Sequence, residues 1–465
     1  MRILFIRPNS RIIATPVPLG IGYVASYLLS KRPEDLVKII DARNRRLSPE
    51  RVVAEAEKFD PDLVGLSAIN FEADQVKILS PLLKQALPDK PIVLGGPYAS
   101  ANREAILLQD PNIDYLALCE GEETFYELVQ ALERNQDPSG VAGIIFRQDG
   151  RIKFTGERPP VQELDSLPFN WELLDPKSYF LRRGRNSENI VKYSHRTLSI
   201  ITSRGCPYGC IFCHNLFGKK FRARSAEQVV SEVAIITEKY GVRELEMVDD
   251  SFNLDLLRAK EICRGIIARV PGLHLSLPNG IRGDLVDEEF LDLLKKAGFY
   301  RIAFAVESAS PRIQKLIKKK INLDKVQWAI AETSKRGMVA SGYFIMGFPE
   351  ETEQDLELTI KFARESKLSV ASFWYLNPFP GTEVAKMAGE EKLSERLFRD
   401  YNTMTVNLSA VSDAKLHQLN KRAYRQFYLH PARLWRILRV APKNFRTLLN
   451  AFLVFRLFFQ DSVSQ

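Results

Sequence analysis

The stretch Cys206-Pro-Tyr-Gly-Cys210-Ile-Phe-Cys213 contains three of the five cysteines in a sequence of 465 residues. Thiolates this close together, separated by small and turn-forming residues, can bind one metal centre from a single loop. An iron–sulfur cube held by four thiolates is coordinatively closed, whereas three thiolates leave one iron free for another ligand. The spacing therefore predicts an iron–sulfur cluster with one open coordination position.

A zinc ion bound by the three cysteines and the adjacent His214 is the main alternative. Zinc ligands usually come as two separated pairs, and a histidine directly after Cys213 is awkwardly placed to bind the same ion. The pattern favours the cluster. The other two cysteines, Cys119 and Cys263, lie in apolar stretches and are expected to be core residues.

The Cx3CxxC spacing, with Phe212 before the last cysteine, resembles the signature of the radical S-adenosylmethionine (SAM) superfamily. The resemblance implies that Cys206, Cys210 and Cys213 bind a [4Fe-4S] cluster whose open iron chelates the amino and carboxylate groups of SAM. It also implies that the reduced cluster cleaves SAM to a 5′-deoxyadenosyl radical. The electron would come from an external one-electron reductant such as flavodoxin or ferredoxin.

Length and composition are typical of an ordinary soluble protein. A chain of 465 residues predicts two or three domains, and 45% hydrophobic with 26% charged residues is usual for a soluble protein. Residues 1–6 lead directly into a strand, so no signal peptide is expected. No uncharged apolar run is long enough to span a bilayer. Clustered cysteines without a secretory signal indicate the reducing cytoplasm.

Residues 1–150 alternate short apolar runs with amphipathic helical patterns, which predicts βαβ units and a parallel sheet. Strands are expected at residues 2–6, 37–40, 63–67, 92–94 and 114–118, and helices at 21–29, 49–58, 74–86 and up to 132. Ligands of such sheets bind beyond the carboxyl ends of the strands. The sequence has no GxGxxG motif, so a nicotinamide dinucleotide is not expected.

Several of these strand ends resemble the Rossmann-like cobalamin-binding domain that precedes many radical SAM proteins: Pro18-Leu-Gly-Ile-Gly-Tyr23, Asp41, residues 61–67, Gly95-Gly96 and Glu120-Gly-Glu122. The resemblance implies cobalamin contacts from Leu19, Gly20, Asp41, Ser67, Asn70, Gly95, Gly96, Tyr98, Glu120 and Gly121. One motif departs from the pattern. Domains with a cobalt-ligating histidine carry Asp-x-His-x-x-Gly, but Ala42 and Arg43 follow Asp41 here. We therefore expect no imidazole from this loop on the lower face of cobalamin.

Residues 151–195 are expected to form a proline-stiffened linker, preceded by a hairpin around Asp149-Gly150. From 196 to 385, six strand–helix repeats predict a partial (β/α)6 barrel of the TIM type, which resembles the radical SAM core. The strands are expected near residue 198 and at 244–248, 274–277, 301–306, 339–345 and 371–376, with helices at 254–268, 288–296 and 311–316. The predicted fold class is α/β, with a helical C-terminal region at 386–465.

Polar residues follow the expected barrel strands, which is where functional residues of such barrels lie. The resemblance assigns SAM contacts to Phe212, Asp249, Asp250, Asn279, Arg282, Glu307, Ser308 and Gly347. The two aspartates would accept hydrogen bonds from the SAM ammonium, and Asn279 or Arg282 would bind its carboxylate or ribose. Gly347 ends the strand against which adenine would pack.

The C-terminal tail carries most of the net charge. Residues 413–461 contain ten Lys or Arg and two Asp, a difference of +8 in a chain whose net charge is +9. Helices are expected at 410–428, 432–440 and 445–459. The last one is basic and amphipathic, which fits either peripheral contact with an anionic membrane or packing on the protein with solvated arginines. No nucleic-acid-binding module accompanies the charge, so nucleic acid is not an expected partner.

Together these features predict a cobalamin-dependent radical SAM enzyme that methylates an unactivated carbon of a small-molecule or lipid substrate. The first alternative is a cyclase, rearrangement or C–C bond-modifying enzyme of the same architecture, acting on a lipid or a tetrapyrrole. A methylthiotransferase is not expected, because that family has extra cluster-binding cysteines and this sequence has none before Cys119. A metal-binding scaffold without catalytic activity is the alternative outside the enzymes.

Overall fold

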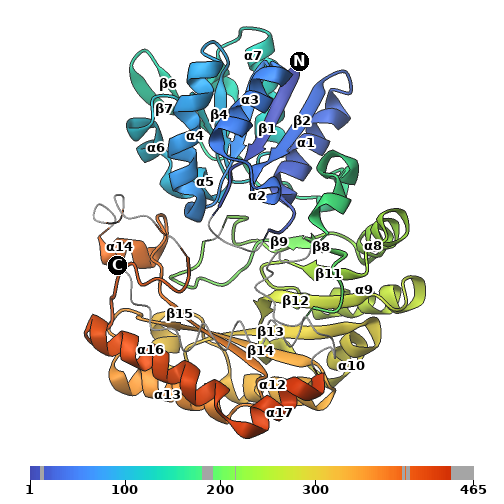
Figure 1. Cartoon of the computed structure of the whole chain (residues 1–465), viewed down its shortest axis with the longest axis vertical. Coiled ribbons are helices and arrows are strands. Elements are labelled where there is room, and N and C mark those ends of the chain that lie inside the picture. Colours follow the sequence, from blue (N-terminus) through green and yellow to red (C-terminus); the bar gives the residue numbers. More distant parts are fainter. Residues whose placement is uncertain are drawn as a thin grey trace. The chain divides into compact units, whose positions relative to one another are not determined.

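The computed structural model describes residues 1–10, 15–180, 192–214, 216–389, 393, 398 and 400–440. The chain divides into two compact units (Figure 1). The first comprises Met1–Tyr179, His214–Arg222 and Phe379–Asp400, and the second comprises Phe180–Cys213, Ala223–Pro378 and Tyr401–Gln465. The predicted domain limits at residues 150, 195 and 385 assume that each domain is one continuous segment. They stay predictions.

The first unit is built on a seven-stranded sheet of order β2-β1-β3-β4-β5-β6-β7. Strands β1 (Arg2–Arg7), β2 (Leu36–Asp41), β3 (Leu63–Ser67), β4 (Ile92–Gly95) and β5 (Tyr115–Ala117) are parallel. All five strands predicted for this region are present. The predicted hairpin, β6 (Ile144–Gln148) and β7 (Arg151–Phe154), extends the same sheet at its edge in antiparallel orientation.

Successive residues of β1 alternate between two apolar cores. Leu4 and Ile6 belong to the core that contains α3 (Pro49–Phe59), α4 (Ala73–Ala86), α5 (Gly96–Asn102) and α6 (Glu104–Gln109). Ile3 and Phe5 belong to the core with α1 (Leu19–Lys31) and α7 (Glu122–Glu133). A strand covered on both faces needs a continuous apolar run, which explains the sequence Ile-Leu-Phe-Ile at residues 3–6.

The structure corrects the sequence-based picture of this unit at two places. Helices α5 and α6 follow Gly95, where the pattern predicts none, because Pro97 stands in the first turn of a helix rather than in an open loop. Cys119 is exposed, so its prediction as a core residue was wrong. It follows β5 with a left-handed backbone (φ 56°), outside the apolar core. Cys263 in contrast is buried, as predicted.

The second unit contains six parallel strands in the order β15-β14-β13-β12-β11-β8. They are β8 (Thr197–Ile200), β11 (Glu244–Met247), β12 (His274–Ile281), β13 (Phe299–Glu307), β14 (Val339–Met346) and β15 (Val370–Tyr375). β8 and β15 each have one neighbour in this sheet, so the predicted six-stranded barrel is present and open. Two short strands, β9 (Ser203–Arg204) and β10 (Arg222–Ala223), are not part of it.

Helices alternate with the barrel strands: α8 (Ala226–Tyr240), α9 (Leu256–Arg269), α10 (Glu288–Ala297), α11 (Pro311–Leu316), α12 (Leu323–Lys335) and α13 (Glu353–Glu365). α12 is absent from the sequence-based prediction, although Val326, Ala329 and Ile330 are buried at helical spacing. β12 continues to Ile281 instead of ending at 277, because the chain stays extended through Pro278 with a register shift against β13.

Among the described residues after the last strand, the helices are α14 (Glu383–Ala388), α16 (Asp413–Tyr428) and α17 (Pro431–Val440). α16 starts at Asp413 rather than at 410, because the Ser412 side chain caps it by accepting a hydrogen bond from the Lys415 amide. The helix predicted at 445–459 lies outside the described residues. Within the part of the chain that is described, no helix has the length and apolar character needed to cross a bilayer.

Candidate functional site

The three clustered cysteines lie in the loop after β8. Cys206 and Cys210 are half-buried, and Cys213 is exposed. The Ile211 amide anchors the loop by donating to the carbonyl oxygen of Ile317 at 3.2 Å. Burial raises the pKa of the Cys206 and Cys210 thiols, and the positive charge of Lys319 opposes this shift. A metal centre that accepts their charge would compensate for the burial, which fits a cluster-binding loop.

The fourth ligand of the zinc alternative would be His214. Its Nε2 lies 3.0 Å from the carbonyl oxygen of Pro380, a contact that zinc ligation through this atom would have to break. Among the described residues, no group of three or more His, Cys, Asp or Glu side chains, the three cysteines included, is placed to hold a single metal ion, so this observation does not separate zinc from a cluster. The donor set offered by the loop itself is three sulfurs, the set expected for a cube with one open iron.

Asp249, at the end of β11, braces the segment that leads to Cys206. Its carboxylate is 2% exposed and accepts hydrogen bonds from the Thr202 and Ser203 amides at 2.6 and 2.5 Å. The Thr202 hydroxyl donates to its second oxygen at 2.9 Å. With both oxygens engaged, Asp249 has the contacts of a positioning residue. The neighbouring Asp250 is exposed and accepts one hydrogen bond, from the Gly205 amide at 3.2 Å. Asp250 therefore offers the accessible carboxylate of this pair.

Arg282 and Glu307 both act on the segment around Lys319. The Arg282 guanidinium donates to the Lys319 carbonyl oxygen at 3.0 Å and lies 3.8 Å from the ring centroid of Tyr208, within the cysteine loop. The Glu307 carboxylate lies 2.8 Å from Lys319 Nζ, and its own backbone is left-handed (φ 65°). Such strained backbone costs on the order of 1 kcal/mol and concentrates at functional sites. Exposed Asn279 joins two strands by donating to the Val248 carbonyl oxygen at 2.7 Å.

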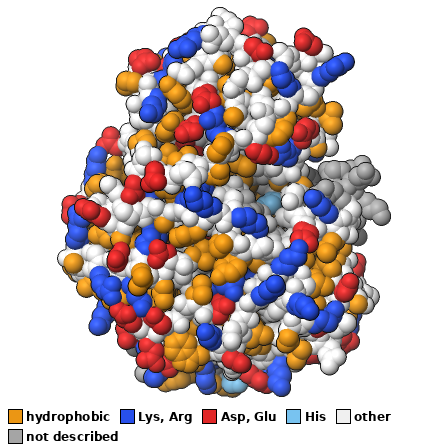
Figure 2. Space-filling view, turned by 180° about the vertical axis from the view of Figure 1, so that it is seen from behind, with side chains coloured by type: hydrophobic (Ala, Val, Ile, Leu, Met, Phe, Trp, Pro, Cys, Tyr) orange, Lys and Arg blue, Asp and Glu red, His pale blue; other side chains and the backbone are white. Residues whose placement is uncertain are grey.

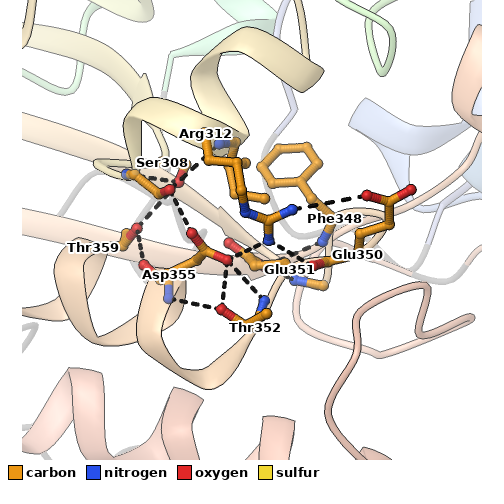
Figure 3. A network of polar contacts seen from close by, with 11 residues as sticks. Ser308, Arg312, Phe348, Glu350, Glu351, Thr352, Asp355 and Thr359 are labelled. Atoms are coloured by element: carbon orange, nitrogen blue, oxygen red, sulfur yellow. Dashed lines mark hydrogen bonds and ion pairs between the residues drawn. The ribbon is translucent and has the colours of Figure 1, made fainter.

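Ser308 belongs to a buried polar network at the end of β13 (Figure 3). Its hydroxyl lies 3.2 Å from that of Thr359, and it is fully buried. Asp355 of α13 accepts hydrogen bonds from Ser310, Arg312 and the Thr352 hydroxyl, at 2.5, 2.5 and 2.6 Å. These groups fix the start of α13 against the end of β13. The contacts of Ser308 are thus internal.

Glu351 holds the turn that ends β14, and sequence reasoning missed it. Its carboxyl is fully buried, and Oε2 accepts hydrogen bonds from the amides of Gly347 (2.7 Å) and Phe348 (3.2 Å). Oε1 has no hydrogen-bond partner, and burial raises the pKa of Glu351 to about 8. The Phe348 ring lies 5.5 Å from the ring of Phe212 in the cysteine loop. Glu351 therefore supports the predicted adenine strand and, through Phe348, the cysteine loop.

In the first unit, Asp41 and Glu120 are engaged by other side chains. Asp41 accepts a hydrogen bond from the Tyr179 hydroxyl at 2.7 Å, and Glu120 forms a buried ion pair with Arg222 at 2.5 Å. Arg43, which stands where other domains have the cobalt-ligating histidine, is buried on the short helix α2 (Ala42–Arg45) and pairs with Glu72 at 3.1 Å. These charged residues organise the strand ends internally.

Asn70 and Tyr98 line a cavity of the first unit. Its other walls include Lys77 and Asn102, and also Pro380 and Phe398. The empty volume is about 490 Å³ with the open mouth included. Its walls combine amide groups, one lysine and apolar rings.

The first-unit glycines that were predicted to contact cobalamin differ in whether the fold itself requires a glycine at that position. Gly96 has a positive φ of 84°, and a Cβ there would lie 2.8 Å from the Ala68 carbonyl oxygen, so the fold itself requires this glycine. A Cβ on Gly20 would meet nothing within 4 Å, and one on Gly95 would meet its nearest atom at 3.6 Å. Gly121 is intermediate, with Val24 at 3.2 Å. Gly20, in the first turn of α1, therefore borders open space, and a Cβ on Gly95, at the end of β4, would be in ordinary van der Waals contact; the two lie next to the partly exposed Leu19 and Ser67. A bulky cofactor needs such space.

Two family models match the chain. The Radical SAM superfamily model matches residues 200–363, and the B12 binding domain model matches residues 14–129. An uncharacterized methyltransferase of Pyrococcus horikoshii is 32% identical, over 93% of this chain and 93% of that protein. The cytidylyl-2-hydroxyethylphosphonate methyltransferase of Streptomyces wedmorensis is 30% identical, over 83% and 81% of the two chains. An anaerobic magnesium-protoporphyrin IX monomethyl ester cyclase of Rubrivivax gelatinosus is 27% identical, over 93% and 78%.

The fold is also found among solved structures. The radical SAM methyltransferase TsrM from Kitasatospora setae, with cobalamin and a [4Fe-4S] cluster bound, superimposes with a TM-score of 0.69. The match covers 85% of this chain and 76% of that chain at 19% identity. At this identity the likeness concerns the fold alone.

Proposed function

Because this chain belongs to the radical SAM superfamily and carries a B12-binding domain, we propose that it methylates an unactivated carbon of a small-molecule or lipid substrate. The observation that carries the proposal is the presence in one chain of a three-sulfur loop at the barrel strand ends and of two first-unit glycines, Gly20 and Gly95, at which a Cβ would clash with nothing. Two relatives that align over most of the chain are named methyltransferases, which supports methyl transfer.

The residues around the cysteine loop suit a [4Fe-4S] cluster and SAM. When bound, the cluster supplies the electron that cleaves SAM to the 5′-deoxyadenosyl radical, and cobalamin carries a methyl group. Cys206, Cys210 and Cys213 hold the cluster, and the positive charge of Lys319 offsets its negative charge. Exposed Asp250 accepts hydrogen bonds from the SAM ammonium. An external one-electron reductant such as flavodoxin or ferredoxin provides the electron in the reducing cytoplasm.

The substrate side of the site is the barrel-sheet face opposite the helices. Along β14 and β15, fully buried residues alternate with the half-buried Tyr343, Ile345, Ser372 and Trp374. Alternation places the half-buried set on one face of the sheet. Tyr343 and Trp374 lie ring to ring at 4.6 Å and offer an aromatic wall. A substrate with an apolar or planar part packs well on such a wall.

Methyl transfer can be tested with SAM that carries a trideuterated methyl group. The protein is reconstituted anaerobically with iron, sulfide and hydroxocobalamin, reduced, and given a small-molecule extract and, separately, a lipid extract of the source cells. We expect 5′-deoxyadenosine, S-adenosylhomocysteine and one new product that carries the three deuterons. Formation of 5′-deoxyadenosine with an unlabelled new product would contradict methyl transfer and support the cyclase-type alternative, which the cyclase relative favours.

Cobalamin binding can be tested at Gly95, where alanine fits the fold. Since the added Cβ has no atom within 3.6 Å, we expect Gly95→Ala to keep the wild-type melting temperature. It should nevertheless weaken cobalamin binding by about tenfold or more, because the methyl group fills the space that close backbone approach requires. Cobalamin retained after anaerobic gel filtration, measured by its absorption spectrum, gives the affinity. Gly96→Ala is the contrasting variant and should lower the melting temperature. Unchanged retention by Gly95→Ala would remove this position from the cobalamin site.

A further inference from the structure

The apolar side of α16 packs on the barrel. Leu416, Leu419, Ala423 and Phe427 are buried. Two tyrosine hydroxyls of the same helix bind the backbone of the edge strand β15: Tyr424 accepts from the Phe373 amide at 3.0 Å, and Tyr428 donates to the Ala371 carbonyl oxygen at 3.0 Å. α16 thereby covers the exposed edge of the sheet. For this basic helix, packing on the protein accounts for the amphipathic pattern.

The next helix, α17, is fixed by a single buried arginine. Arg433 is 0% exposed and donates to the carbonyl oxygens of Ala363, in the last turn of α13, and of Ser366, Leu368 and Phe427, at 2.5–3.2 Å. Its guanidinium also lies 3.5 Å from the centroid of the Phe427 ring. These contacts determine which side of α17 faces the protein. The residues directly after Arg433 point away from that side.

Large hydrophobic side chains are exposed where α16 ends and α17 begins. Leu429 is 54% exposed, Leu434 is 47% exposed and Trp435 is 68% exposed. These three residues will be called the α17 patch. The other large hydrophobic side chains that the described residues expose are scattered along the chain, with no other three within seven positions. Single exposed apolar residues are normal, whereas a cluster that includes tryptophan indicates a contact surface.

The charge around the α17 patch is strongly positive. Residues 421–440, the described part of this segment, contain six Lys or Arg and no Asp or Glu, while the whole chain has a net charge of +9. Elsewhere the charges nearly cancel, and on the face drawn in Figure 2 the basic and acidic side chains are interspersed. We propose that the α17 patch docks on the surface of an anionic lipid bilayer. Tryptophan and leucine enter the headgroup boundary, and exposed basic side chains of this segment such as Arg425 pair with lipid phosphates.

A bilayer fits these features better than other partners. Nucleic acid would account for the arginines but gives Leu429 and Leu434 no apolar environment. A second copy of this chain would bring the same positive charge against itself and repel it. The inference does not depend on methyl transfer, and its test requires no cofactor.

The test is flotation of the full-length protein with vesicles of phosphatidylcholine containing 30 mol% phosphatidylglycerol, compared with phosphatidylcholine alone. We expect binding to the anionic vesicles that weakens in 0.5 M salt, and little binding to the neutral ones. Leu434→Ser/Trp435→Ser should reduce binding by about tenfold or more, because both substitutions remove inserted apolar area. Leu257→Ser is the matched control: Leu257 is 75% exposed on α9, and its replacement should leave binding unchanged.

Three results would overturn the proposal. The first is wild-type protein that stays with the unbound fraction at every lipid concentration. The second is a double variant that binds as the wild type does, in which case any affinity for lipid resides elsewhere, for example in residues 441–465. The third is a wild-type dimer in lipid-free solution that the double substitution dissociates, because the patch would then join two copies of the chain. Melting temperatures of all variants should match, since the substituted side chains are exposed.

Discussion

Replacing Cys206, Cys210 or Cys213 with alanine should lower the iron content of reconstituted protein from about four ions per chain to near zero. The same variants should form no 5′-deoxyadenosine from SAM. Each thiolate binds a different iron of the cube, so two sulfurs leave two irons open and the cluster is lost. Iron analysis, the broad visible absorption of the cluster and chromatography of the nucleoside product measure the three consequences independently.

Cys119→Ser is the matched control for these variants. Cys119 is exposed at the end of β5, outside the cysteine loop, so its replacement should preserve iron content and product formation. Stoichiometric zinc with no iron in the wild-type protein would contradict the cluster and restore the zinc alternative. Product formation that persists in any of the three alanine variants would contradict the assignment of that cysteine.

The strands and the cysteine loop were predictable because local signals encode them. The apolar run at residues 3–6 must be a strand covered on both faces, and three cysteines within eight positions leave few other interpretations. Polar residues at strand ends were also predictable as a group, since in parallel sheets these ends carry the polar loops, although Asn279 lies within β12 and not after it. The helix α12 was not predicted, because its four buried residues are spread over a segment with many charged residues.

The roles of individual site residues depend on partners far away in the sequence. In the sequence, Asp249 is a candidate ligand-binding acid. In the structure, Thr202 and Ser203, which lie 47 and 46 residues earlier, donate hydrogen bonds to its carboxylate. Glu120 pairs with Arg222 across 102 residues. No pattern within a window of the sequence contains such contacts, so sequence motifs identify where the site is but not which groups remain accessible.

Glu350 and Glu351 illustrate the same limit at adjacent positions. The sequence does not distinguish them, yet the Glu350 side chain is 77% exposed while Glu351 is fully buried. We expect Glu351→Ala to destabilise the protein by about 2–5 kcal/mol, because the Gly347 and Phe348 amides lose their acceptor inside the protein. Glu350→Ala is the matched control and should change stability by less than about 0.5 kcal/mol. Chemical denaturation of the cofactor-free protein measures both, and equal losses would contradict the structural role of Glu351.

The protonation of Glu351 leads to a second prediction, which concerns how the stability of the protein depends on pH. Burial raises its pKa from 4.5 to about 8 in the folded protein, so the folded state binds this proton more tightly than the unfolded state. The associated stabilisation is complete below pH 4.5 and is lost as the pH rises through about 8. A shift of this size corresponds to at most about 5 kcal/mol. Glu351→Gln keeps an oxygen acceptor for the two amides but cannot ionise.

The difference in stability between Glu351→Gln and the wild type should therefore depend on pH. Near pH 5.5 both proteins carry an uncharged side chain at position 351 in the folded state, and the wild type still has most of the stabilisation of its bound proton. As the pH rises to 9 the wild type must bury a charge or lose the native turn, whereas the glutamine variant is unaffected at this position. Its stability relative to the wild type should rise steadily over this range. All other titrating groups are shared, so a difference that stays flat from pH 5.5 to 9 would mean that Glu351 is ionised in the native protein.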